Sequence, residues 1–244
     1  MDLKDGGFSF GVRQLDNIVL GTLKPGSLGM FHGPSGTGKS SMLFHFLFEG
    51  AAANQNVALV TAAPPLRVTQ SISHFQSFEP SWIKDGYISI FNISDLLDLV
   101  GLEYGRLEGH DVAIVSDIFR SILDHLDIKR LVIDPFNPLL VLLKGEDLYD
   151  FLIRLKEELT TRDVIGMIAL DTSFDEKDRW PEGLETHLMD TIVGFQREKE
   201  PTMVMNTLTI ERWRGTPHAK NSYVIDISDE GVVLVPKIRP LEVR

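Results

Sequence analysis

An eight-residue segment, Gly33–Ser40 (GPSGTGKS), constrains the fold of this chain more than any other feature. It fits the pattern GxxxxGK[ST], follows the apolar run Gly29–Phe31, and precedes an amphipathic helical pattern that starts at Ser40. The glycines let backbone N–H groups turn inward around an anion, and the helix adds the positive end of its dipole. A flexible Gly/Ser turn is the alternative, but the flanking strand and helix favour a phosphate-binding loop.

The side chains of this loop predict ATP and Mg²⁺ as its ligands. The ammonium of Lys39 can reach the β- and γ-phosphates, and the hydroxyl of Ser40 can bind Mg²⁺. The other residues expected to contact the nucleotide are Ser35, Gly36, Thr37, Gly38 and Ser41.

A second metal ligand is expected at the end of a neighbouring buried strand. The segment Arg130–Asp134 (RLVID) has this form, because it ends a β-favouring run with one carboxylate. Burying that charge is costly without a cation nearby. We therefore predict Ser40 and Asp134 as the metal site and Lys39 and Asp134 as catalytic groups, against the alternative that Asp134 only starts a turn before Pro135.

The alternation of short apolar runs with longer helical patterns predicts an α/β fold built from βαβ units. After about Asp190, three strand patterns follow one another without helices between them, which indicates antiparallel strands added at the C-terminal end of a mainly parallel sheet. No linker or repeat divides the chain, so residues 1–244 are predicted to form a single domain, with residues 1–7 and 237–244 as flexible tails.

Composition excludes several classes of protein. The net charge of −11 disfavours nucleic acid as the default partner, and the absence of cysteine excludes disulfides and thiolate metal sites. The seven histidines show no metal-binding spacing. No apolar run is long enough for membrane insertion, and the acidic start does not have the form of a secretory signal, so we expect a cytoplasmic protein.

Three segments together resemble the KaiC-like branch of the RecA superfamily of P-loop ATPases. They are residues 10–41 with the phosphate-binding loop, residues 130–136 (RLVIDPF), and residues 212–236, which begin RWRGTPHAK. The last segment distinguishes this branch from other P-loop proteins, because it matches the branch's pattern K-x-R-G-T-x-H-x-K followed by a strand and D-x-G. The resemblance covers nearly the whole chain and implies a RecA-like sheet covered by helices on both faces.

The same resemblance implies a homo-oligomer, a hexameric ring, with ATP between neighbouring subunits. It implies that Arg212 and Arg214 reach the γ-phosphate bound by the adjacent subunit, where Arg214 acts as an arginine finger. His218, Lys220 and Asp229 match positions that contact the sugar and base of the neighbour's nucleotide. Arg212 replaces the usual lysine. Without the resemblance, this segment reads as a solvated, charged edge strand.

The chain departs from the family at the tip of the strand after the phosphate-binding helix. The family has two consecutive glutamates there, one of which orients and deprotonates the attacking water. This chain has Ala62, Ala63, Pro64 and Pro65. Positioning of water commonly contributes about 10²- to 10⁴-fold in rate. Asp171, at the end of a later buried strand, is a candidate substitute, and its alternative role is to start a turn.

Nucleotide binding is thus strongly encoded, whereas hydrolysis is not. The sequence predicts an ATP-binding protein that assembles on its nucleotide and acts as a switch or assembly platform for a protein partner, with weak or absent hydrolysis. The alternatives are the ATP-binding ring component of the archaeal swimming motor, an active RecA-type ATPase, and a recombination-mediator paralogue. No DNA-binding motif with basic and aromatic residues supports the last.

Overall fold

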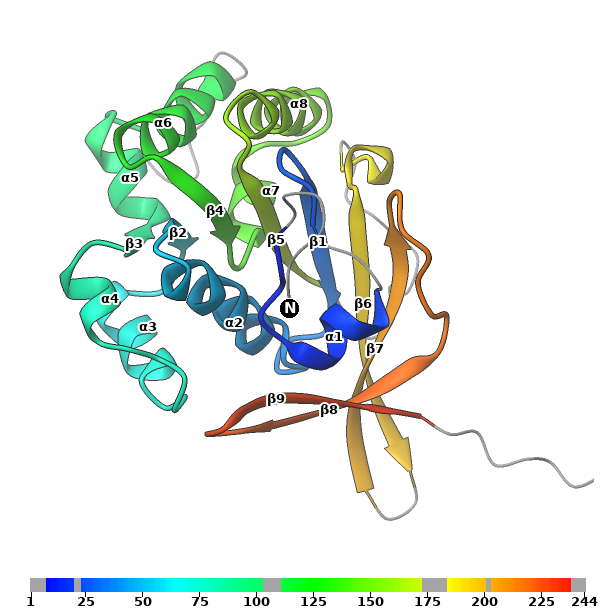
Figure 1. Cartoon of the computed structure of the whole chain (residues 1–244). Helices are drawn as coiled ribbons and strands as arrows, with labels where there is room; N and C mark the ends of the chain where they lie inside the picture. The colour runs from blue at the N-terminus through cyan, green and yellow to red at the C-terminus, as the bar shows by residue number, and fades with distance from the viewer. Residues whose placement is uncertain (1–7, 20–22, 103–110, 173–183, 201–202, 238–244) are drawn as a thin grey trace, which may run out of the picture.

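The computed structural model describes residues 8–19, 23–102, 111–172, 184–200 and 203–237. These residues form one sheet with the strand order β3-β2-β4-β5-β1-β6-β7-β8-β9 (Figure 1). The strands are β1 Leu28–Gly33, β2 Asn56–Thr61, β3 Ile88–Asn92, β4 Ile128–Ile133, β5 Ile165–Asp171, β6 Thr191–Glu200, β7 Met203–Trp213, β8 Ser222–Ser228 and β9 Gly231–Pro236.

Helices cover both faces of the sheet. They are α1 Arg13–Ile18, α2 Lys39–Ala52, α3 Pro65–Ile72, α4 Ser81–Lys84, α5 Ile93–Leu99, α6 Asp111–His125, α7 Asn137–Leu142, α8 Glu146–Thr161 and the short 3₁₀ helix η1 Thr186–Leu188. Apolar residues of α1, α2 and α3 form one buried cluster with one face of the sheet, and those of α5 to α8 form a second cluster with the other. Two cores on opposite faces keep the central strands dry on both sides.

The periodicity of α8 shows how the sequence specifies these layers. Leu148, Phe151, Leu152, Leu155 and Leu159 recur at helical spacing and are all buried against the sheet and α6. Between them lie acidic and basic residues on the solvent side of the helix. The predicted α/β architecture with helices on both faces is therefore confirmed.

The antiparallel addition at the C-terminal end is also confirmed, with one refinement. Strand β6 pairs with β1 in parallel, so the antiparallel part begins at β7 and continues through β8 and β9. The β8–β9 hairpin lies below α2 in the view of Figure 1, and its strand β9 contacts that helix. Gly231 permits this contact, because it has φ +133° and a Cβ there would lie 3.0 Å from Cε1 of His45 on α2.

Some local structure differs from the sequence interpretation. Residues 65–84 show no clear period but contain the two helices α3 and α4. Pro65 occupies the first turn of α3, where a missing N–H costs nothing. Lys237 is not part of a loose tail, since its N–H donates to the carbonyl of Ser222 and its ammonium pairs with Glu198. Residues 1–7 and 238–244 lie outside the described part of the chain.

Within the described ranges, no helix combines the length and the apolar character needed to cross a bilayer.

Candidate functional site

The segment Gly33–Ser40 forms a tight loop between the end of β1 and the start of α2. Gly33 has φ +142°, and a Cβ at this position would lie 2.2 Å from the carbonyl oxygen of Phe195. Gly38 precedes the helix with φ +105°. Only glycine adopts such backbone angles without strain, which is why the pattern needs glycine at both positions. The hydroxyl of Thr37 closes the loop by donating to the carbonyl of Pro34 at 2.7 Å.

The ammonium of Lys39 lies inside this loop and is almost fully buried. It donates to the carbonyl oxygens of Gly33 at 2.7 Å and Pro34 at 2.9 Å, and its distance to the carboxylate of Asp171 is 2.7 Å. A buried lysine is stable only with such partners. The arrangement places one positive charge at the centre of the loop, where an incoming phosphate would replace the carboxylate as its counter-ion.

Two side chains that sequence reasoning missed hold the loop from the neighbouring strands. The guanidinium of Arg197 on β6 donates to the carbonyl of Gly36 at 2.9 Å, and the amide of Asn206 on β7 donates to the same oxygen at 3.2 Å. Both side chains bind the Gly36 carbonyl and so tie the loop to β6 and β7. No local signal in the sequence links residue 36 to residues 197 and 206.

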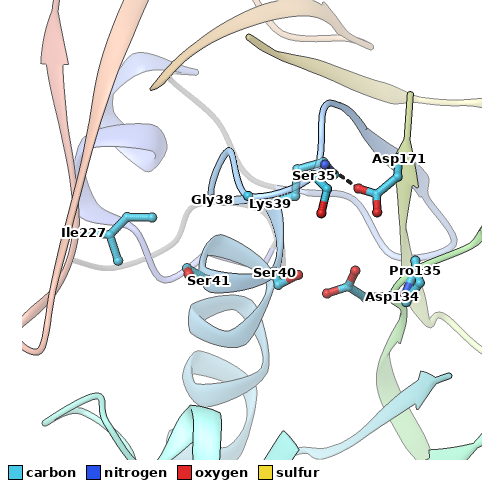
Figure 2. A pocket seen from close by; sticks show the side chains of 10 residues that line it. Ser35, Gly38, Lys39, Ser40, Ser41, Asp134, Pro135, Asp171 and Ile227 are labelled. Carbon is cyan, nitrogen blue, oxygen red and sulfur yellow. Dashed lines mark ion pairs between the residues drawn. The ribbon is translucent and has the colours of Figure 1, made fainter. Parts of the chain in front are cut away.

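A cavity of about 290 Å³ opens beside the loop (Figure 2). Its lining residues are Ser35, Gly36, Gly38, Lys39, Ser40, Ser41, Asp134, Pro135, Asp171 and Ile227. Six of the seven loop residues predicted to contact the nucleotide line this cavity, and the seventh, Thr37, is buried. Ile227, on β8, was not predicted and closes the side of the cavity next to Gly38.

Ser40 and Asp134 face each other across this cavity (Figure 2). Burial raises the pKa of the Asp134 carboxyl, while the hydrogen bond from Ser40 and the charge of Lys39 oppose this shift. The negative charge of Asp171 adds to the rise. A buried carboxylate beside a hydroxyl, with the nearest ammonium already bonded to another acid, is an arrangement that favours a bound cation.

Asp171 is brought to the site by the register of the sheet, because it ends β5 directly beside Gly33 of β1. Its backbone is fixed by Asn137, whose amide nitrogen donates to the Asp171 carbonyl at 2.9 Å and whose oxygen accepts from the Asp171 N–H at 2.8 Å. Its carboxylate side chain remains 41% exposed. Asp171 therefore presents a carboxylate to the phosphate end of the cavity, bound to Lys39.

The segment Ala62–Pro65, where the resemblance implies two glutamates, follows the strand β2 that lies beside Asp134. The N–H of Asp134 donates to the carbonyl of Val60 at 3.0 Å, so the tips of β2 and β4 are adjacent. The amide of Asn92 donates to the carbonyls of Ala62 at 3.3 Å and Ala63 at 3.2 Å, which fixes the tip of β2. Ala63 lines a second cavity that also contains Ser40 and Asp134.

Arg212 and Arg214 lie at the opposite end of the strands from the loop. Thr191, which pairs with Trp213, lies beside Gly29, four residues and about 13 Å of strand before the loop begins. Arg214 donates to Asp190 at 3.0 Å and to the carbonyl of His187 at 3.1 Å, and its side chain is 55% exposed. Arg212 donates to the carbonyls of Thr186 and Met189. Neither guanidinium lines the cavity of its own chain.

The remaining residues of the predicted neighbour-contacting group are separated by the fold. His218 and Lys220 follow Arg214 in the same surface segment. Asp229 instead lies at the β8–β9 turn, where its carbonyl and carboxylate accept from the backbone and side chain of Gln76, each at 2.8 Å. It is two residues from Ile227, which lines the cavity of the same chain. The fold thus separates Asp229 from His218 and Lys220, and the contact of these three residues with a neighbour's nucleotide stays a prediction.

Comparisons with known proteins agree with this fold. The profile of the KaiC ATPase family matches residues 8–239. The chain is 21% identical over 230 residues to a UPF0273 protein of Pyrococcus furiosus, covering 93% of this chain and 92% of that protein. It is 24% identical over 224 residues to a UPF0273 protein of Sulfurisphaera tokodaii, covering 90% and 78% of the two chains.

Among solved structures, a KaiC-like protein of Pyrococcus horikoshii superposes with a TM-score of 0.77 at 18% identity, covering 94% of this chain and 99% of that one. At this identity the likeness establishes the fold, a RecA-like sheet with antiparallel strands at its end. The family match, which extends over nearly all of the chain, establishes more: the chain belongs to the KaiC family of ATPases.

Proposed function

We propose that this protein is a cytoplasmic ATP-binding switch that assembles with the nucleotide between its subunits and hydrolyses it weakly or not at all. The observation that supports the proposal is the wall beside Asp134, which Ala63 lines in the segment where the family resemblance implies acids. Among the described residues that line this wall, Asp134 is the only carboxylate. The protein would report ATP occupancy to a partner protein.

ATP binding is supported by the loop that is already formed. Lys39 is buried with its ammonium at the centre, and Arg197 and Asn206 hold the loop backbone from the strands. A ligand therefore meets an organised cradle, so little conformational entropy is lost on binding. The helix α2 begins at Lys39 and directs its N-terminal N–H groups toward the cavity.

The donor set at the cavity also fits Mg²⁺. Ser40 and Asp134 would hold the ion, as one hydroxyl and one carboxylate, with nucleotide phosphates and water completing the ligands. In the described part of the chain no group of three histidines, cysteines or acids could hold a metal alone, so the ion would bind together with the nucleotide. When bound, it supplies positive charge that neutralises the terminal phosphates.

Asp134→Asn is expected to weaken Mg²⁺-dependent ATP binding by about 10-fold or more and to stabilise the nucleotide-free protein. Burial raises the pKa of Asp134, so its ionised form destabilises the fold as the pH rises from the ordinary pKa of 3.8 through the raised value. The asparagine keeps the hydrogen-bonding shape without the charge. Each kcal/mol gained at neutral pH raises the melting temperature by roughly 2–4 °C.

The measurements are thermal unfolding at pH 4 and pH 7 without nucleotide, and calorimetric ATP titration with Mg²⁺ and with a chelator. The gain in melting temperature should be larger at pH 7, and the loss of affinity should vanish with the chelator. Asp127→Asn, at an 80% exposed carboxylate before β4, is the matched control and should change neither quantity. A variant less stable at pH 7 than the wild type would contradict this account of Asp134.

Assembly through the nucleotide is supported by the position of Arg212 and Arg214. Both lie about the length of a strand from the loop of their own chain, so only a second copy can bring them to a bound nucleotide. Arg214 is more than half exposed and is held at the surface by Asp190. If the assembled state binds ATP more tightly than the separate chains, ATP shifts the equilibrium toward assembly without any turnover.

The decisive experiment measures molecular mass and phosphate release on one sample, with and without ATP and Mg²⁺. We expect a larger assembly, a hexamer by analogy with the family, only when ATP is present, and phosphate release well below one turnover per second. Lys39→Ala should abolish the ATP-dependent assembly. A constant mass with rapid phosphate release would overturn the proposal.

A second candidate function, a competent ATPase, is favoured by one observation, the carboxylate of Asp171 at the phosphate end of the cavity. It could orient water once a phosphate has drawn Lys39 away from it. Asp171→Asn separates the two functions. If turnover is substantial in the wild type and falls at least 100-fold in this variant, Asp171 is the base and the protein is an active ATPase.

A further inference from the structure

A second cavity, of about 390 Å³, adjoins the phosphate-binding hollow and is not explained by the proposed contacts. Its lining residues are Ser40, Phe44, Leu59, Thr61, Ala63, Arg67, Val68, Ser71, Asp134 and Pro135. It shares Ser40, Asp134 and Pro135 with the first cavity. The two hollows therefore meet at the predicted metal site, where the terminal phosphate of a bound nucleotide would lie.

Within the described part of the chain, the second cavity is lined by one cation and one acid, although the family resemblance implies two glutamates in this region. Arg67 is its only cation among the described lining residues, and the only carboxylate is Asp134, which accepts from Ser40. The hydroxyl of Thr61 accepts from the N–H of Ala63, which leaves its own O–H free to donate, and the hydroxyl of Ser71 donates to the carbonyl of Arg67. Among the described lining residues, the guanidinium of Arg67 is the one charged donor that the cavity offers an anion.

Arg67 is firmly placed by its backbone but not by its side chain. Its N–H donates to the carbonyl of Pro64 at 2.9 Å, which sets it in the first turn of α3. In the described part of the chain its guanidinium has no hydrogen-bond acceptor or carboxylate partner, and the residue is exposed. An arginine that lines a cavity next to a phosphate cradle, with its donors unused, is suited to a bidentate contact with phosphate oxygens.

We propose that Arg67 binds the terminal phosphate of ATP in this second cavity and so distinguishes ATP from ADP. The inference rests on the proposed function, because it places ATP in the first cavity. ADP lacks the phosphate that this guanidinium would contact. Position 63 of this chain holds alanine and not an acid. The space beside Asp134 would therefore serve to bind the third phosphate, and not to orient a water molecule for attack on it.

The test consists of two calorimetric titrations of the full-length protein in the presence of Mg²⁺. One uses ADP, and the other uses the β,γ-methylene analogue of ATP. Arg67→Gln should weaken binding of the analogue by about 10- to 100-fold, the range for a hydrogen bond to a charged group, and change ADP binding by less than about threefold. Arg67→Lys should fall between the two, since an ammonium keeps the charge but not the planar fork.

The matched control is Arg154→Gln, which removes an exposed arginine from α8 on the other face of the sheet and should affect neither nucleotide. Unchanged analogue binding in Arg67→Gln, or an equal loss for both nucleotides, would overturn the proposal while leaving ATP binding intact. A wild-type protein that binds neither nucleotide would overturn the proposed function, and the role of Arg67 with it.

Discussion

Replacing Ala63 with glutamate is expected to raise the rate of ATP hydrolysis by about 100-fold or more. Ala63 lines the cavity that contains Ser40 and Asp134, and its carbonyl is fixed by Asn92 at 3.2 Å. A carboxylate introduced there would lie beside the predicted metal site on a tip that is already held in place. It would supply a water-orienting carboxylate at a position where the family resemblance implies one. Phosphate release at saturating ATP and Mg²⁺ measures the effect.

The neighbouring residue provides the control. Ala62 is also fixed by Asn92, at 3.3 Å, but it is exposed and does not line the cavity, so Ala62→Glu should leave the rate unchanged. Because Arg67 can pair with the introduced acid and lower its basicity, Ala63→Glu is also measured together with Arg67→Gln. If ATP still binds and neither variant gains turnover, the missing acid is not what limits hydrolysis.

Much of this site could be predicted from the sequence, because many of its functional residues are close together in the chain or directly follow a recognisable strand. The phosphate-binding loop occupies eight consecutive residues, and Asp134 follows a buried strand at once. The mainly parallel sheet follows from the alternation of strands and helices, because each helical crossover returns the chain to the end of the sheet where the previous strand began. The carboxyl ends of these strands therefore lie side by side. The structure brings Lys39, Ser40, Asp134 and Asp171 into one cavity for this reason.

The parts that the sequence did not predict depend on pairings between distant strands. Arg197 and Asn206 support Gly36 only because β6 lies beside β1 and folds back as β7. The resemblance groups Asp229 with His218 and Lys220 at a neighbour's nucleotide, a contact that stays a prediction. The β8–β9 hairpin carries Asp229 to the other end of the strands, near Ile227. Such positions follow from strand order and register, which residue spacing does not reveal.

In the Ala63→Glu background, where turnover is large enough to measure, Arg214→Ala is expected to lower the rate of ATP turnover by about 1,000-fold. The guanidinium is 55% exposed, and the loop of its own chain lies at the other end of β1, so its effect must come from a second copy. The fold should survive the change, because Asp190 keeps its ion pair with Lys156 at 2.6 Å. Melting temperature and ATP-dependent mass, measured on the same sample, check this.

Mixing two inactive variants decides whether the contact runs between subunits. Both variants carry Ala63→Glu. The Lys39→Ala variant lacks the phosphate-binding ammonium but keeps Arg214, and the Arg214→Ala variant lacks the arginine but keeps Lys39. A mixed assembly contains interfaces at which the intact loop of one chain meets the intact arginine of the next, so turnover should return on mixing. The same mixture prepared without ATP should stay unassembled. If mixed assemblies form and remain inactive, Arg214 does not act on a neighbour's nucleotide, and its place beside Asp190 is only structural.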